Sequence, residues 1–120
     1  MSMFFTPPSR LLRSLAAPAL LLAAGLGASA ASATDEAAQM ALGKKLFTTT
    51  TPACALCHTL KDAGAEGAIG PAFNDLQPDA ARVSKALHDG LGAMPSFKGT
   101  LTEEQIAALA LYVSKASRLP

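Results

Sequence analysis

Residues 52–60 read PACALCHTL and hold the only two cysteines of the chain, Cys54 and Cys57, followed directly by His58. A disulfide stabilises mainly by closing a long loop in the unfolded chain, and two thiols three residues apart close almost none. The pattern Cys-x-x-Cys-His is instead typical of covalent c-type haem attachment. On one helical turn both sulfurs point the same way, so they can bond the two vinyl groups on one porphyrin edge. The motif predicts one covalent haem c, held by Cys54 and Cys57, with His58 as an axial iron ligand.

Two other kinds of site use the same residue types. A dithiol redox centre also has two cysteines separated by two residues, but it is built on a βαβ framework that this sequence does not predict. A structural zinc site needs four ligands, and His88 is the only plausible fourth ligand after Cys54, Cys57 and His58. Both alternatives are weaker interpretations of the motif than haem attachment.

Residues 1–33 have the pattern of a cleaved signal peptide. Arg10 and Arg13 precede an uncharged Leu/Ala-rich run, and the small residues ASAASA at 28–33 offer cleavage sites after Ala30 or Ala33. We expect cleavage after Ala33 and a periplasmic protein of residues 34–120, with no membrane attachment after cleavage. The alternative is a retained anchor, but the apolar run is shorter than the roughly 20 residues of a membrane span and contains Pro18.

Residues 34–120 form one small, nearly neutral domain, with eight basic and nine acidic residues. This balance argues against nucleic-acid binding, which needs a concentrated basic face. A domain of this size is marginally stable unless a cofactor, a metal or a covalent cross-link completes its core. No nucleophile with a neighbouring base and no carboxylate pair suggests catalysis, so the sequence predicts no enzyme by itself.

Helical patterns dominate this domain and predict an all-α fold. The four expected helices are 36–48, a short one at 54–60, one that starts at Pro78 and Asp79 and stops at Gly90, and 102–117. The residues TEEQ at 102–105 match a capping box, and Ile106, Leu109, Tyr112 and Val113 follow at helical spacing. No alternating run is long enough for a strand. The glycine-rich stretches 61–77 and 90–99 are expected to wrap around the cofactor.

The second axial ligand of the iron has few candidates, namely Met94, Met40, His88 and, less favoured, the lysines. Met94 lies in the second glycine-rich stretch next to Pro95, and a loop residue can direct its thioether at the iron. Met40 lies on the apolar face of the first expected helix, where a core position is the simpler interpretation. His88 lies near a helix C-terminus, where the helix dipole favours a cation at the surface. We therefore predict Met94.

The motif, Gly70-Pro71, MPSF at 94–97 and the two terminal helices together resemble a class I monohaem cytochrome c of the short bacterial type. The resemblance implies the cytochrome c fold, with three to four helices around one covalently bound haem. It also implies that the carbonyl of Pro71 accepts a hydrogen bond from His58 Nδ1. In this family the first and last helices cross closely, and the matching positions here are Gly43, Phe47, Leu109 and Tyr112.

The stretches PACALCHTLKDAGAEGAIGP, PDAARV and MPSFKGTLTEEQI are more narrowly similar to small cytochromes that accept electrons from periplasmic sulfite dehydrogenases. The resemblance implies a one-electron carrier whose partners are redox proteins: such a dehydrogenase, and a terminal oxidase or another cytochrome. Two alternatives stay open. The chain would be a permanent subunit of a periplasmic dehydrogenase complex, or a gas-binding haem module with an open sixth position on the iron.

Overall fold

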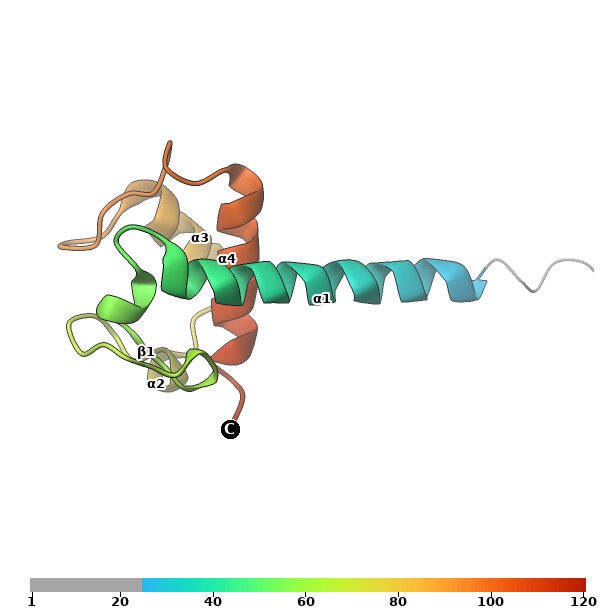
Figure 1. The fold of residues 1–120 in the computed structure, drawn as a ribbon, viewed down its shortest axis with the longest axis horizontal. Helices are drawn as coiled ribbons and strands as arrows, with labels where there is room; N and C mark the ends of the chain where they lie inside the picture. Colours follow the sequence, from blue (N-terminus) through green and yellow to red (C-terminus); the bar gives the residue numbers. More distant parts are fainter. Residues whose placement is uncertain (1–24) are drawn as a thin grey trace, which may run out of the picture.

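The computed structural model describes residues 25–120, with side chains described from Ser32 onward. Most of the predicted signal peptide, residues 1–24, therefore lies outside the described residues. Two long helices dominate the fold, with shorter elements on one side of them (Figure 1). In chain order the elements are α1 (Gly25–Thr49), the 3-10 turn η1 (Cys54–Leu56), β1 (Thr59–Leu60), the 3-10 turn η2 (Lys61–Ala63), β2 (Ala65–Glu66), α2 (Phe73–Leu76), α3 (Ala80–Asp89) and α4 (Glu103–Ala116).

The fold is centred on the contact of α1 and α4, which cross each other in Figure 1. At the crossing, a Cβ added to Gly43 would lie 2.3 Å from the carbonyl oxygen of Ala108 and 2.4 Å from Tyr112 Cβ. Only glycine therefore permits this approach of the two backbones. Phe47 and Tyr112, both fully buried, pack edge to face with ring centroids 6.0 Å apart. The predicted crossing of the first and last helices is confirmed.

Side-chain caps set the starts of α3 and α4, and the cap of α4 is the capping box that the sequence predicts. Thr102 Oγ1 accepts from the Gln105 backbone N–H at 3.2 Å, and the Gln105 side chain accepts from the Thr102 N–H at 2.9 Å. Asp79 accepts from the Arg82 N–H at 2.7 Å and so caps α3. The apolar stripe of α4 is buried, so the helical spacing of its apolar residues correctly identified its inner face.

Other local predictions were wrong. The expected helix 54–60 is only the 3-10 turn η1, because the chain then pairs as β1 with β2, Leu60 opposite Ala65. Pro78 precedes the cap of α3 and is not its first residue. α1 begins at Gly25 and not at Glu36, because the Ala-rich stretch that precedes Glu36 is itself helix-forming. No helix was predicted at α2, a single turn.

Membrane insertion was the alternative for the N-terminal segment. From residue 25 to the C-terminus, no helix has both the length and the hydropathy that a bilayer span requires. Figure 1 shows α1 extending well beyond its crossing with α4 toward its N-terminal end. The predicted cleavage position after Ala33 falls within α1. The α1 residues Glu36, Gly43 and Phe47, which contact α4, lie in the predicted domain 34–120.

Candidate haem site

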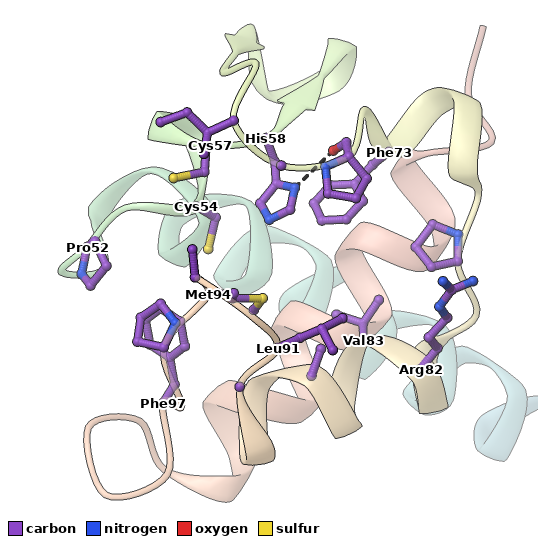
Figure 2. Close-up of a pocket in the computed structure, with 18 of the residues that line it drawn as sticks. Pro52, Cys54, Cys57, His58, Phe73, Arg82, Val83, Leu91, Met94 and Phe97 are labelled. Atoms are coloured by element: carbon purple, nitrogen blue, oxygen red, sulfur yellow. Dashed lines mark hydrogen bonds between the residues drawn. The ribbon is translucent and has the colours of Figure 1, made fainter.

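A cavity of about 630 Å³ lies beside the crossing of α1 and α4. This volume falls within the roughly 300–1,000 Å³ of typical cofactor pockets. Its walls come from the Cys-x-x-Cys-His segment, residues 69–78, one face of α3 and the loop after α3 (Figure 2). Most of the lining residues are apolar. The two glycine-rich stretches thus wrap around one cavity.

The attachment motif forms one wall of this cavity. The N–H groups of Cys57 and His58 both donate to the carbonyl oxygen of Cys54, at 3.1 and 2.9 Å. This turn brings Cys54, Cys57 and His58 to the same cavity (Figure 2). The two cysteines form no disulfide. Burial raises the pKa of the Cys54 thiol, whereas a dithiol redox centre works with a lowered thiol pKa.

The zinc alternative lacks its fourth ligand. Among the described side chains, no group of three or more His, Cys, Asp or Glu residues gathers as a metal site would require. His88 does not line the cavity, because its ring nitrogens are turned to Ser84 and Glu103. The residues around Cys54 and Cys57 therefore do not suit a closed four-ligand zinc site.

His58 is fixed by three neighbours and is only 9% exposed. Its Nδ1 lies 2.9 Å from the carbonyl oxygen of Pro71, which can only accept, so Nδ1 carries the proton. The ring stacks on Phe73, with centroids 4.3 Å apart and an interplanar angle of 16°. A Cβ on Gly70 would come within 2.5 Å of the His58 ring. Nε2 is therefore left with the lone pair that an iron ligand needs.

Met94 belongs to the opposite wall, in the loop between α3 and α4 (Figure 2). The N–H of Leu91 donates to Met94 O and the N–H of Met94 donates to Leu91 O, both at 3.0 Å. The loop lies against Gly90, where φ is +72° and an added Cβ would come within 2.9 Å of Met94 O. This tight turn holds Met94 at the cavity.

The competing candidates for the second ligand lie elsewhere. Met40 packs against the hydrophobic core from α1 and does not line the cavity. His88 is engaged outside the cavity, as described above. Lys85 is at the cavity wall, but its Nζ is paired with Asp89 at 2.6 Å. Of the predicted candidates, Met94 alone combines a cavity position with a ligand atom free of a charged partner.

Several cavity residues were not identified from the sequence. Phe73 was not singled out, although it is the residue that stacks on His58. Ile69 and Leu91 line the cavity while staying 80% and 73% exposed. Arg82 lies at the end of the cavity away from Cys54 and Cys57 (Figure 2). A large apolar residue within a glycine-rich stretch was the sequence signal that would have pointed to Ile69 and Leu91.

The donor set and the cavity fit a covalently bound haem. Two thiols on one edge, an imidazole nitrogen and a thioether on facing walls are the groups by which a c-type haem is held. The glycines at positions 67 and 70 keep the motif free of side chains that would collide with Cys57 and His58. These observations were compared with known proteins.

The family model described as cytochrome c oxidase, cbb3-type, subunit III matches residues 38–113. A cytochrome c6 of Tetradesmus obliquus is 34% identical over 87 residues, which cover 63% of this chain and 89% of that protein. A cytochrome c6 of Leptolyngbya boryana is 36% identical over 80 residues, covering 63% and 91%. The crystal structure of the c-type cytochrome SorU from Sinorhizobium meliloti superimposes with a TM-score of 0.64 and 49% identity, covering 66% of this chain and 91% of that one.

These matches confirm the resemblance drawn from the motif, the predicted all-α fold and the predicted cofactor. They extend over the α1–α4 crossing and the whole cavity wall, and they include proteins named for the same cofactor chemistry. The chain therefore belongs to this cytochrome c family, and it is a small electron-transfer protein built on one covalently attached c-type haem.

Proposed function

We propose that this cytochrome is a periplasmic one-electron carrier in which Cys54 and Cys57 form the thioether bonds and His58 and Met94 are the axial iron ligands. The single observation that carries the ligand assignment is the common cavity, which gathers these four side chains and excludes Met40 and His88. The bound haem supplies an iron that alternates between Fe(III) and Fe(II).

The protein residues would set how readily that electron moves. Pro71 O orients the His58 ring and makes it a stronger donor through the hydrogen bond at Nδ1. The Met94 thioether favours the reduced state relative to a second imidazole. The apolar walls exclude water, so little solvent must reorganise on electron transfer. Arg82, which lines the cavity at the end away from the thiols, would provide a cation for the carboxylates of a bound haem.

A partner would dock over the open side of the cavity. Leu56, Ile69 and Leu91 are exposed large apolar side chains next to or within the cavity wall. Weak redox complexes use small interfaces of this kind. Exposed lysines would steer an acidic partner toward this surface, but Lys44 is already paired with Asp62 at 3.1 Å. Lys45, Lys61 and Lys98 remain the candidates for steering.

We propose a periplasmic sulfite dehydrogenase as the electron donor and a terminal oxidase or another cytochrome as the acceptor. The support is the resemblance over the haem motif and the Met94 loop, together with 49% identity to a bacterial c-type cytochrome along most of its length. A permanent dehydrogenase subunit would co-purify with its catalytic chain in equal amounts, whereas a diffusible carrier is isolated alone.

The test is the visible spectrum and midpoint potential of the periplasmic protein before and after Met94→Ala. Ferric haem with a methionine ligand shows a weak charge-transfer band at the red end of the visible spectrum. We expect Met94→Ala to abolish this band, to lower the midpoint potential and to open the iron to carbon monoxide in the ferrous state. The matched control is Met40→Leu, which removes a thioether outside the cavity and should keep the band.

Unchanged spectra and potential in Met94→Ala would contradict the ligand assignment. Ready binding of carbon monoxide by the wild-type protein would favour the gas-binding alternative. The intact mass of the same preparation reports on export, because cleavage after Ala33 leaves residues 34–120 plus one haem. A mass that retains residues 1–33 would favour the anchored form.

A further inference from the structure

The loop that carries Met94 is closed at its base by a contact between two helix ends. His88 lies next to the last residue of α3, and Glu103 is the first residue of α4. His88 Nε2 lies 2.8 Å from Glu103 Oε2, across the start and the end of loop 90–101. Fixing the two ends of a loop reduces the conformations that it can sample. The contact is therefore placed to restrict the Met94 loop.

A charged histidine makes this contact an ion pair and satisfies both neighbours of the ring. His88 Nδ1 lies 2.8 Å from the carbonyl oxygen of Ser84, and Nε2 faces the Glu103 carboxylate. Both neighbours are acceptors, and only the doubly protonated imidazolium has a proton for each. The hydrogen bond to Glu103, followed by the one to Ser84, raises the pKa of His88 above its ordinary value.

His88 is also bonded directly to the loop. Its carbonyl oxygen accepts a hydrogen bond of 2.5 Å from Ser96 Oγ, two residues after Met94. One residue earlier in α3, Leu87 O accepts from the Phe97 N–H at 2.7 Å. The C-terminal end of α3 thus holds the chain on the far side of Met94, while Glu103 holds that end of α3 against α4.

We propose that His88 and Glu103 are positioning residues for Met94: their charged pair closes the base of the loop and holds the methionine sulfur in place, and deprotonation of His88 weakens this ligand. The inference rests on the proposed role of Met94 as the axial ligand. His88 itself touches neither Met94 nor His58 among the hydrogen bonds and ring contacts of the described residues.

The two carboxylates near His88 act in the same direction on its protonation. Glu103 on α4 and Asp89 on α3 both favour the imidazolium. Lys85 and Lys98 face Asp89 and partly offset its charge. Because the pKa of His88 is higher in the folded protein, the pair is complete below the ordinary value of 6.5 and is lost as the pH rises through the folded value.

The experiment follows the red methionine band of the ferric holoprotein and its midpoint potential against pH, with the His88 ring protons followed by NMR. In the wild type, band intensity and potential should fall together with the His88 titration. Glu103→Gln keeps the shape of the side chain but removes its charge, so the NMR titration and the band loss should both move to lower pH. His88→Gln should lose this pH dependence.

Glu36→Gln is the matched control, because Glu36 forms another exposed pair between helices, with Lys115 at 2.5 Å, away from the Met94 loop. It should behave as the wild type. The inference is overturned if the band is insensitive to the His88 titration, or if Glu103→Gln moves the titration and leaves the band in place. A wild-type protein without the band at any pH contradicts the Met94 assignment instead, so the two failures are distinguishable.

Discussion

Tyr112 is a polar residue placed at the most buried part of the α1–α4 crossing, with 1% of its surface exposed. Its hydroxyl donates a hydrogen bond of 2.7 Å to Asp62 Oδ2, and Lys44 Nζ lies 3.1 Å from the same oxygen. Burial raises the pKa of the Tyr112 phenol. The hydrogen bond from Tyr112, ahead of the one from Lys44, lowers the pKa of Asp62. One carboxylate thus links α4, α1 and η2.

We predict that Tyr112→Phe lowers the free energy of unfolding by about 0.5–1.5 kcal/mol at neutral pH, the net contribution of one hydrogen bond. The pKa of Asp62 is depressed in the folded state, so its contribution is present above its ordinary value of 3.8 and is lost as the pH falls through the folded value. Urea unfolding of both proteins at neutral and acid pH measures the difference, which should shrink in acid.

Asp62→Ala and the double variant complete a mutant cycle for this pair. The cycle should show that the two single effects are not additive, because each removes the same hydrogen bond. A difference that is the same at both pH values would mean that the hydroxyl acts through packing and not through the carboxylate.

At the scale of elements, the α1–α4 crossing depends on the missing side chain of Gly43. Alanine normally stabilises a helix by about 1 kcal/mol relative to glycine. Here the added Cβ would overlap the Ala108 carbonyl oxygen and Tyr112 Cβ, and neither the backbone nor a Cβ can move without shifting a helix. The crossing therefore opposes the local helix propensity.

We predict that Gly43→Ala destabilises the protein by about 1–3 kcal/mol, as overpacking of a tight core does. Lys45→Ala is the control, because Lys45 is exposed on the same helix and its replacement should leave stability nearly unchanged. Thermal unfolding of the two holoproteins measures the effect. A Gly43→Ala protein as stable as the control would show that α1 and α4 can separate at no cost.

At the scale of the whole molecule, the buried apolar core borders directly on the cavity. The buried cluster fills the space between α1, α3 and α4, while the cavity of about 630 Å³ separates α3 and the Met94 loop from the attachment motif. Side chains that face a void lose the contacts of a packed interior. A haem bound in the cavity would therefore contribute to the free energy of folding as well as to the redox chemistry.

We predict that the Cys54→Ser/Cys57→Ser double variant, isolated without haem, loses most of its helical circular dichroism and its cooperative urea transition. The holoprotein matured with haem attachment is the reference. A haem-free variant with native helicity and a cooperative transition would show that α1, α3 and α4 suffice for folding.

Prediction from sequence succeeded where neighbours in the chain decide the outcome. The capping box at Thr102 and Gln105 and the helical spacing of the α4 core residues are both local, and each appears in the structure. The helix expected through Thr59 and Leu60 failed, because pairing partners seven and five residues later compete for the same backbone groups. The start of α1 was misplaced because the Ala-rich residues before Glu36 also form helix.

The sequence by itself determined the cofactor chemistry, because covalent attachment depends on two thiols and an imidazole within five consecutive residues. It also determined the two terminal helices and the glycine between them. Only the tertiary structure brought Phe73 to His58 and paired His88 with Glu103. Both contacts join residues 15 positions apart, and they depend on how the chain packs and not on the local spacing of residues.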